Sequence, residues 1–284
     1  MARERRSARA TSGRHGSHLL AYVVLGATGA LMAFPFVWQI IMSLSTNAEV
    51  QSVTPVLVPE RLVWENYAEV FRRLPFLEQL STSVLITVIR SLAQLLLCTM
   101  AGFAFARLVF PGRDIIFALL LVILMVPGQV YLLTQFQIVM KLGLLNSVAG
   151  LVLPGLFSAF GTFLMRTAFA GLPRELEDAA KLDGANTLQL FARIMVPLVK
   201  PTMSVLVVTT ALWSWNDLLW PLVVSTRASA MPLSAGIASL TSDTALTDYP
   251  VVLAASLLAM APILIIFMIL QRRVIEGLTF GGLK

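Results

Sequence analysis

Long apolar stretches, separated by short segments that carry most of the charges, are the dominant pattern of this chain. Six of them are almost free of Asp, Glu, Lys and Arg: 19–44, 79–106, 115–140, 142–165, 201–226 and 249–271. A transmembrane helix needs about 20 apolar residues to cross a hydrocarbon core about 30 Å thick. The pattern therefore predicts an all-α membrane protein with six transmembrane helices.

Composition supports a bilayer as the solvent of this chain. Hydrophobic residues make up 57% of the 284 residues, charged residues 13%, and the mean hydropathy is +0.83. Ordinary soluble domains contain about a quarter charged residues. The net charge of +6 does not indicate nucleic-acid binding, because the basic residues lie in a polar tail and in short segments between apolar stretches.

The distribution of Lys and Arg predicts the orientation. The tail 1–18 and the segments 107–114, 166–200 and 272–284 hold fifteen of the 21 basic residues, and the opposite side holds five. Positive charge is enriched on the cytoplasmic side. We therefore expect both termini to be cytoplasmic, with a basic tail (1–18), a transmembrane domain (19–271) and a C-terminal tail (272–284).

Few residues are suited to metal or nucleophilic chemistry. The only cysteine, Cys98, lies in an apolar stretch, and the only histidines, His15 and His18, lie in the tail. A histidine-based metal site or nucleophilic triad inside the membrane is therefore excluded, and we predict no metal site.

Two external loops are long enough to have a role. Residues 45–78 include Val63, Tyr67, Val70, Leu74 and Leu77 at helical spacing, which predicts a short amphipathic helix at the membrane interface. The loop 225–248 is rich in small and polar residues.

The cytoplasmic segment 172–200 predicts two short helices. The first opens after Pro173, carries acidic residues in its first turn and stops at Gly184, where glycine adopts a left-handed cap most easily. The second runs from about Asn186 to Ile194, and Pro197 breaks it. On one side of that helix we expect Leu188, Phe191, Ala192 and Met195.

This segment could rest on lipid headgroups or dock on a protein partner. Connections in helix bundles usually span about 2–8 residues, so this one is long. Its acidic residues would also be repelled by an anionic leaflet. Both features favour docking.

The same segment resembles the EAA loop of bacterial ABC-importer permeases, whose pattern is E-A-A, a glycine six residues after the Glu, and then I-x-L-P. With Gly184 in register, Asp178 takes the place of the family Glu, and Val196 that of the Leu. The resemblance implies that the segment docks on an ATPase through these residues: Glu175, Glu177, Asp178, Ala179, Ala180, Asp183, Gly184, Ala185, Phe191, Ile194 and Pro197. Since Asp178 has a shorter side chain than Glu, Glu177 is an alternative carboxylate for a contact with the ATPase.

Three further stretches resemble the carbohydrate-importer branch of that family, and in particular the shorter permease subunit of maltose-type systems: AFARLVFPGRD (104–114), LWSWNDLLWPL (212–222) and QRRVIEGLTFGGLK (271–284). The resemblance extends from about Leu19 to the C-terminus. It implies a type I ABC-importer transmembrane domain with cytoplasmic coupling helices, in a bacterial inner membrane. In the resembled family the counterpart of the loop 225–248 contacts the solute-binding protein.

Arg90 and Asp217 are charges inside predicted spans, where ionisable residues often mark functional sites. Arg90 is either a structural partner of a neighbouring helix or part of a translocation path. Asp217, beside Asn216 and three tryptophans, lies either at the external end of its span or on the path. Arg90, Asn216 and Asp217 are the candidate path residues.

The chain contains no G-x-x-x-x-G-K-[ST] motif, so it has no Walker-A loop of its own. The resemblance implies a non-catalytic permease subunit for a sugar or oligosaccharide, with polyols also open. Its expected partners are a second permease subunit, two ATPase subunits that bind ATP and Mg²⁺, and an external solute-binding protein. The rival hypotheses are a stand-alone secondary transporter or channel, which calls for paired intramembrane charges and inverted repeats, and a membrane enzyme.

Overall fold

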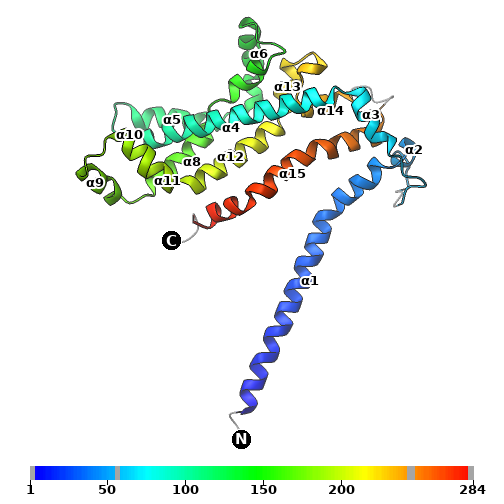
Figure 1. The fold of residues 1–284 in the computed structure, drawn as a ribbon, viewed down its shortest axis with the longest axis horizontal. Coiled ribbons are helices and arrows are strands. Elements are labelled where there is room, and N and C mark those ends of the chain that lie inside the picture. Colours follow the sequence, from blue (N-terminus) through cyan, green and yellow to red (C-terminus); the bar gives the residue numbers. More distant parts are fainter. Residues whose placement is uncertain (1–3, 55–57, 242–246, 281–284) are drawn as a thin grey trace. The chain divides into compact units, whose positions relative to one another are not determined.

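The computed structural model of the chain describes residues 4–54, 58–241 and 247–280, and every regular element in these ranges is a helix (Figure 1). The predicted all-α class is therefore confirmed. The helices form two compact units. The first contains the chain up to residue 70 together with 248–257, and the second contains residues 71–247 and the chain from 258 onward.

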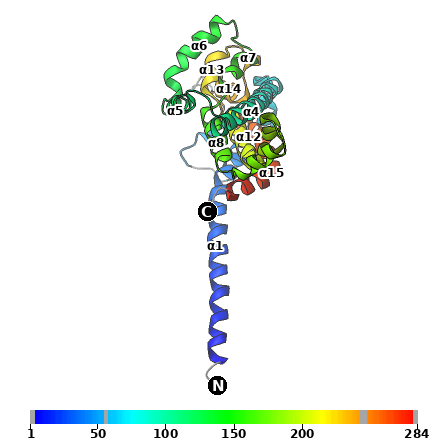
Figure 2. The same cartoon turned by 90° about the vertical axis from the view of Figure 1, so that its left-hand side faces the viewer.

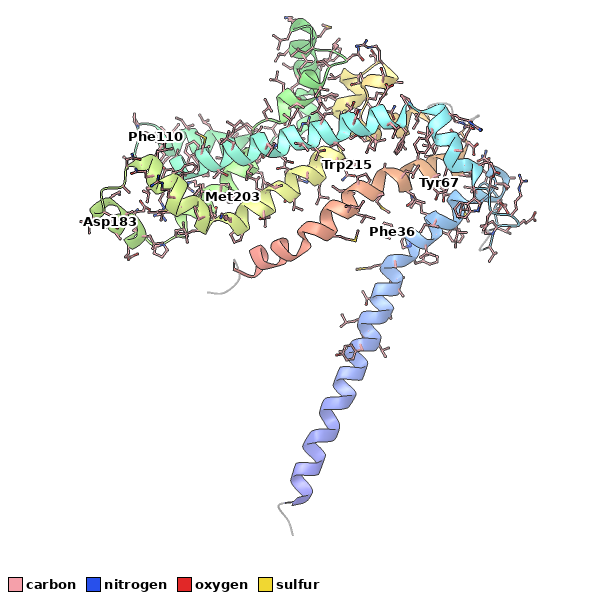
Figure 3. All side chains as sticks on the ribbon, in the orientation of Figure 1. Phe36, Tyr67, Phe110, Asp183, Met203 and Trp215 are labelled. Carbon is pink, nitrogen blue, oxygen red and sulfur yellow. The ribbon has the colours of Figure 1, made fainter. Side chains whose placement is uncertain are left out.

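The first unit is built from α1 (Glu4–Ser43), α2 (Asn47–Val50), most of α3 (Glu65–Arg73) and the first turns of α15 (Tyr249–Phe280). Polar contacts close the end of α1, because Tyr67 hydrogen-bonds Ser43 Oγ at 2.9 Å and Asn66 donates to the carbonyls of Ser43 and Ser45. Tyr67 is labelled in Figure 3. The predicted amphipathic helix exists as α3, and Val70 on its apolar face is fully buried in the protein.

Glu49 organises the segment that follows α1, which the sequence predicts to be external. Its carboxylate accepts hydrogen bonds from the backbone N–H and the hydroxyl of Thr46 at 2.7 and 2.8 Å, and from the backbone N–H of Glu60 at 2.8 Å. These donors stabilise the charged form, so the pKa of Glu49 is lowered from its ordinary value. Glu49 therefore ties the end of α1 to the chain at Glu60.

The second unit is organised around α4 (Phe76–Arg107), against which α8 (Ala159–Ala170) and α12 (Lys200–Trp215) pack along much of their length. Figure 2 shows the three helices side by side. Besides the end of α3 and the part of α15 from Leu258 onward, this unit contains α5 (Arg113–Ile123), η1 (Gly128–Tyr131), α6 (Leu132–Lys141), α7 (Val148–Val152), η2 (Leu153–Gly155), α9 (Glu175–Leu182), α10 (Thr187–Gln189), the π-helical turn η3 (Leu190–Met195), α11 (Val196–Leu198), α13 (Leu219–Val224), η4 (Ala228–Ala230) and α14 (Leu233–Ser239).

Several predicted spans are bent rather than straight. In the part of the chain that the structure describes, Ala21–Ser43 and Phe76–Arg107 are each long and apolar enough to cross a membrane unaided. Three further pairs of helices are long and apolar enough to cross a membrane only if the two helices of each pair are counted together. These pairs bend by 93° after Ile123, 44° after Gly155 and 76° after Leu198. Pro127 lies at the sharpest of these breaks, where it lacks an N–H and disfavours helix in the preceding residue.

The predicted segment boundaries differ from the helix ends at both termini. Helix α1 begins at Glu4, inside the predicted tail 1–18, and α15 continues to Phe280, inside the predicted tail 272–284. The last predicted stretch, 249–271, lies within α15 (Tyr249–Phe280). The tail residues 281–284 lie outside the described residues, and the count of six spans stays a prediction.

Glycine allows α4 and α8 to approach closely. A Cβ built on Gly102 would lie 2.5 Å from Met165 Cβ and 2.8 Å from the backbone N of Arg166. Small residues at such crossings are the common device by which membrane helices pack. No atom lies within 4 Å of the corresponding position at Gly29 in α1.

We predict that Gly102→Ala destabilises the protein by about 1–3 kcal/mol, because the added methyl forces two packed helices apart. Gly29→Ala is the matched control, and it should be neutral or slightly stabilising because alanine favours helix. Thermal unfolding of the two variants in the same detergent tests this difference. Equal midpoints for Gly102→Ala and the unsubstituted chain would contradict the close packing of α4 on α8.

Candidate functional site

Helix α9 ends in the cap that the sequence predicted. Gly184 has a φ of +81°, its N–H donates to the carbonyl of Lys181 at 3.0 Å, and the N–H of Ala185 donates to the carbonyl of Ala180 at 2.9 Å. These two bonds form a Schellman motif, which places a left-handed residue after the last helical turn. Asp183, labelled in Figure 3, caps the helix just before this turn. The predicted stop at Gly184 is confirmed.

Glu177 does not lie on the exposed face of α9. Its side chain is about 10% exposed and forms a 2.7 Å ion pair with Nη1 of Arg107 at the end of α4. Arg107 also donates to the carbonyls of Phe169 and Leu172, where α8 ends. One guanidinium therefore joins α4, the end of α8 and α9. Glu177 therefore pairs inside this chain, and its role as an alternative carboxylate for an ATPase contact stays a prediction.

The second half of the segment differs from the single short helix that was predicted. Asn186 caps α10 through a reciprocal capping box with Gln189. The helix then widens into the π turn η3, continues through Pro197 in α11 and turns at Val199 into α12. Because Pro197 has no N–H and crowds the preceding turn, a wider turn ahead of it is physically reasonable.

The widened turn also changes which residues face inward. Leu188 and Ala192, predicted to share the apolar side, are exposed, whereas Leu190 and Met195 are buried and Phe191 is half-buried. The rings of Phe103, Phe169 and Phe191 lie 5.0–6.4 Å apart by centroid. This aromatic cluster joins η3 to α4 and α8.

The predicted docking residues therefore divide into two sets. Glu177 and Ala180 are buried, and Ala185, Phe191 and Ile194 are half-buried. The exposed members are Glu175, Asp178, Ala179, Asp183, Gly184 and Pro197. Two leucines outside the predicted docking set, Leu182 and Leu188, are 89% and 73% exposed. The outward face of the segment thus combines carboxylates with large apolar side chains.

Arg90 and Asp217 form one ion pair, a contact that the sequence analysis did not predict. The Nη1 of Arg90 lies 2.9 Å from Asp217 Oδ2, and Nη2 donates to the carbonyl of Leu151. The Arg90 side chain is 10% exposed and that of Asp217 is 24% exposed. Arg90 thus contacts an acid and a carbonyl on neighbouring elements, and its place on a translocation path stays a prediction.

The pair also lies on the wall of two hollows, of about 280 and 420 Å³. Both hollows are lined by Arg90, Gly155 and Asp217, and the larger one also by Asn216 and Trp213. Gln94 links the helices behind this wall, since it donates to the carbonyl of Gly155 at 2.8 Å and accepts from Thr210 at 2.9 Å. The three candidate path residues therefore share one cavity wall.

The segment 225–248, predicted to be external, is tightly packed along the part that the structure describes. The Ser83 hydroxyl accepts from the N–H of Leu233, Gln79 donates to the carbonyl of Ala228, and a Cβ at Gly236 would collide with the Gln79 amide. The hydroxyl of Ser234 donates to the carbonyl of Asp217 at 2.6 Å. Helix α14 is therefore built into the second unit, and residues 242–246 lie outside the described residues.

Among the described residues no group of three or more His, Cys, Asp or Glu side chains is placed to hold a metal ion.

Relatives of known family share nearly the whole chain. It is 34% identical to arabinooligosaccharide transport system permease proteins of Halalkalibacterium halodurans and Bacillus subtilis, over 89% of this chain and 92% and 91% of theirs. It is 30% identical to the sn-glycerol-3-phosphate transport system permease protein of Yersinia enterocolitica, over 93% of this chain and 97% of that protein.

A solved structure shares the fold. A chain from a bacterial ABC transporter involved in the import of the acidic polysaccharide alginate matches 89% of this chain with a TM-score of 0.75 and 23% identity. The family model for binding-protein-dependent transport system inner membrane components matches residues 94–279. The chain belongs to the family of inner membrane components of binding-protein-dependent transport systems.

Proposed function

We propose that this chain is a permease subunit of an ATP-driven importer that moves a sugar or oligosaccharide delivered by a solute-binding protein. The observation that carries the proposal is the folded cytoplasmic segment, whose inner face is fixed to α4 and α8 and whose outer face is free to dock. Relatives named for arabinooligosaccharide and glycerol-phosphate transport support carbohydrate or polyol cargo.

The outer face suits a protein partner better than a lipid surface. Glu175, Asp178 and Asp183 supply three exposed carboxylates to this segment, and Leu182 and Leu188 supply two exposed apolar side chains. Anionic headgroups would repel the carboxylates. A groove with basic residues and an apolar floor would match both kinds of side chain. The partner that we assign to this face is an ATPase subunit.

ATP and Mg²⁺ would be held by two such ATPase subunits, since this chain has no Walker-A loop. In this scheme the permease hydrolyses nothing itself. Closure of the ATPase dimer would move the docking segment, and Arg107 with the aromatic cluster would pass the movement to α4 and α8. A second permease subunit would complete the path, and both termini would face the cytoplasm as the basic residues indicate.

The path that we propose runs along the wall formed by Arg90, Asn216 and Asp217. This wall combines the hydrogen-bonding groups of these three residues with the ring of Trp213, which is 58% exposed. Sugar hydroxyls and the apolar face of a sugar ring could use both kinds of surface.

A stand-alone secondary transporter would need paired intramembrane charges, and Arg90–Asp217 is such a pair. Membership of a binding-protein-dependent family weighs against that alternative. Purification of the chain from its native membrane tests the choice directly. The proposal expects an ATPase, a second permease and cargo-dependent ATP hydrolysis to accompany it, and recovery of the chain alone with active uptake would contradict it.

Neighbouring carboxylates in α9 should give opposite phenotypes. We predict that Asp178→Lys leaves the chain stable and lowers cargo-stimulated ATP hydrolysis about tenfold or more, because it reverses a charge on the docking face. Glu177→Gln should instead lower stability by about 3–5 kcal/mol, because it leaves the buried Arg107 charge unpaired. Unfolding and ATPase measurements on both variants check this pattern. Normal coupling in stable Asp178→Lys would remove Asp178 from the interface.

The turn at Gly184 can be tested by backbone conformation alone, because no atom lies within 4 Å of the position of an added Cβ. We predict that Gly184→Val costs on the order of 1–2 kcal/mol in the docking segment, since a β-branched residue disfavours positive φ. Gly184→Asn, which tolerates that conformation better, should retain most ATPase binding. Equal recovery of ATPase subunits with the Val and Asn variants would contradict the capped turn.

A further inference from the structure

The charges on the proposed path are balanced within this chain. Among the described residues that line the two hollows, Arg90 and Asp217 alone carry formal charges, and they are paired at 2.9 Å. The other polar lining residues are uncharged: Gln94, Gln129, Gln135, Thr210, Ser214 and Asn216. Rings of Tyr131, Trp213 and Trp220 complete the lining.

Arg90 has little to offer an anion in the cavity. One of its terminal nitrogens donates to Asp217 and the other to the carbonyl of Leu151, and the side chain as a whole is only 10% exposed. Its Nε is buried beside Gly155, where a Cβ would lie 2.6 Å from that nitrogen. Asp217 is the more exposed partner. The pair therefore presents a carboxylate edge to the cavity rather than a free guanidinium.

A phosphate or uronate group gains from a basic wall and is disfavoured by a carboxylate edge. Uncharged sugars need only hydrogen-bonding groups and an apolar surface, and this wall supplies both. The named relatives and the solved structure include neutral and anionic cargo alike, so family membership leaves this choice open.

We propose that Asp217 is a specificity-determining residue that neutralises Arg90, so that the wall takes uncharged oligosaccharides and rejects anionic ones. This inference rests on the proposed function of the wall as the cargo path. Beyond that function, it states that the cargo is uncharged and that Asp217 is the residue responsible for this selectivity. Removing the Asp217 charge should expose Arg90 and open the site to carboxylated sugars.

A cysteine in the cavity can report the local charge. In the assembled complex, with Cys98→Ala to remove the native thiol, Gln129→Cys places a thiol on an exposed lining residue of the smaller hollow. Its reaction rates with a negatively and a positively charged methanethiosulfonate reagent give a ratio. Val53→Cys is the reference, because Val53 is fully exposed on the external segment.

The measured quantity is the rate with the negative reagent divided by the rate with the positive reagent at position 129, relative to the same quotient at position 53. With the native Arg90–Asp217 pair we expect this relative ratio to be about 1 or lower. Asp217→Asn should raise it about tenfold, and Arg90→Gln with Asp217→Asn should return it to about 1. A high native ratio that Asp217→Asn leaves unchanged would show that Arg90 is not neutralised. If Asp217→Asn does not assemble, Arg90→Gln alone still tests the inference. This variant leaves the Asp217 charge without its partner, so the relative ratio should fall, and an unchanged ratio would overturn the inference.

Protection by sugars tests the ligand class at the same thiol. Arabinotriose should slow modification of Gln129→Cys with the native pair, and trigalacturonate should not, whereas Asp217→Asn should gain protection by trigalacturonate. Native protection by trigalacturonate equal to that by arabinotriose, or protection by neither sugar, would overturn the inference. ATP-dependent uptake by the same complex judges the proposed function separately, since the thiol measurements require no turnover.

Discussion

The guanidinium of Arg107 is the contact on which the position of the segment 172–200 against α4 and α8 depends. It closes the end of α8 through two carbonyls and holds α9 through Glu177, all from the last residue of α4. A buried ion pair is costly to break, because the remaining charge is left without a partner in a poorly solvated site. The segment 172–200 is therefore held to α4 and α8, which it would move in the proposed importer. Its exposed face is not used in these contacts.

Helix α4 connects the two candidate sites. Arg107 at its end and Arg90 within it are 17 residues apart, which corresponds to about 25 Å along an α-helix. Between them α4 is packed against α8 and α12, with Gly102 at a point of close approach. Densely packed helices shift as units rather than deform continuously. In the proposed importer, this arrangement lets movement of the docking segment reach the wall that holds Arg90 and Asp217.

Local rules predicted the features that depend on neighbouring residues. The stop at Gly184 follows from the conformational freedom of glycine, and the apolar stretches follow from the thickness of a bilayer. The pairing of Arg90 with Asp217 joins residues 127 positions apart, and no local pattern in a single sequence encodes such a contact. The burial of Glu177 was missed for the same reason, because its partner Arg107 lies on another helix.

Photo-crosslinking from the exposed face of the segment 172–200 tests directly whether that face contacts an ATPase subunit. A photoreactive amino acid in place of Leu182, the most exposed leucine of the segment, should capture an ATPase subunit in native membranes, and the same group in place of Val53 on the external segment should not. We expect the ATPase subunit to be captured from position 182 and not from position 53. Crosslinks from position 182 to lipid only, with a complex that still transports, would contradict it.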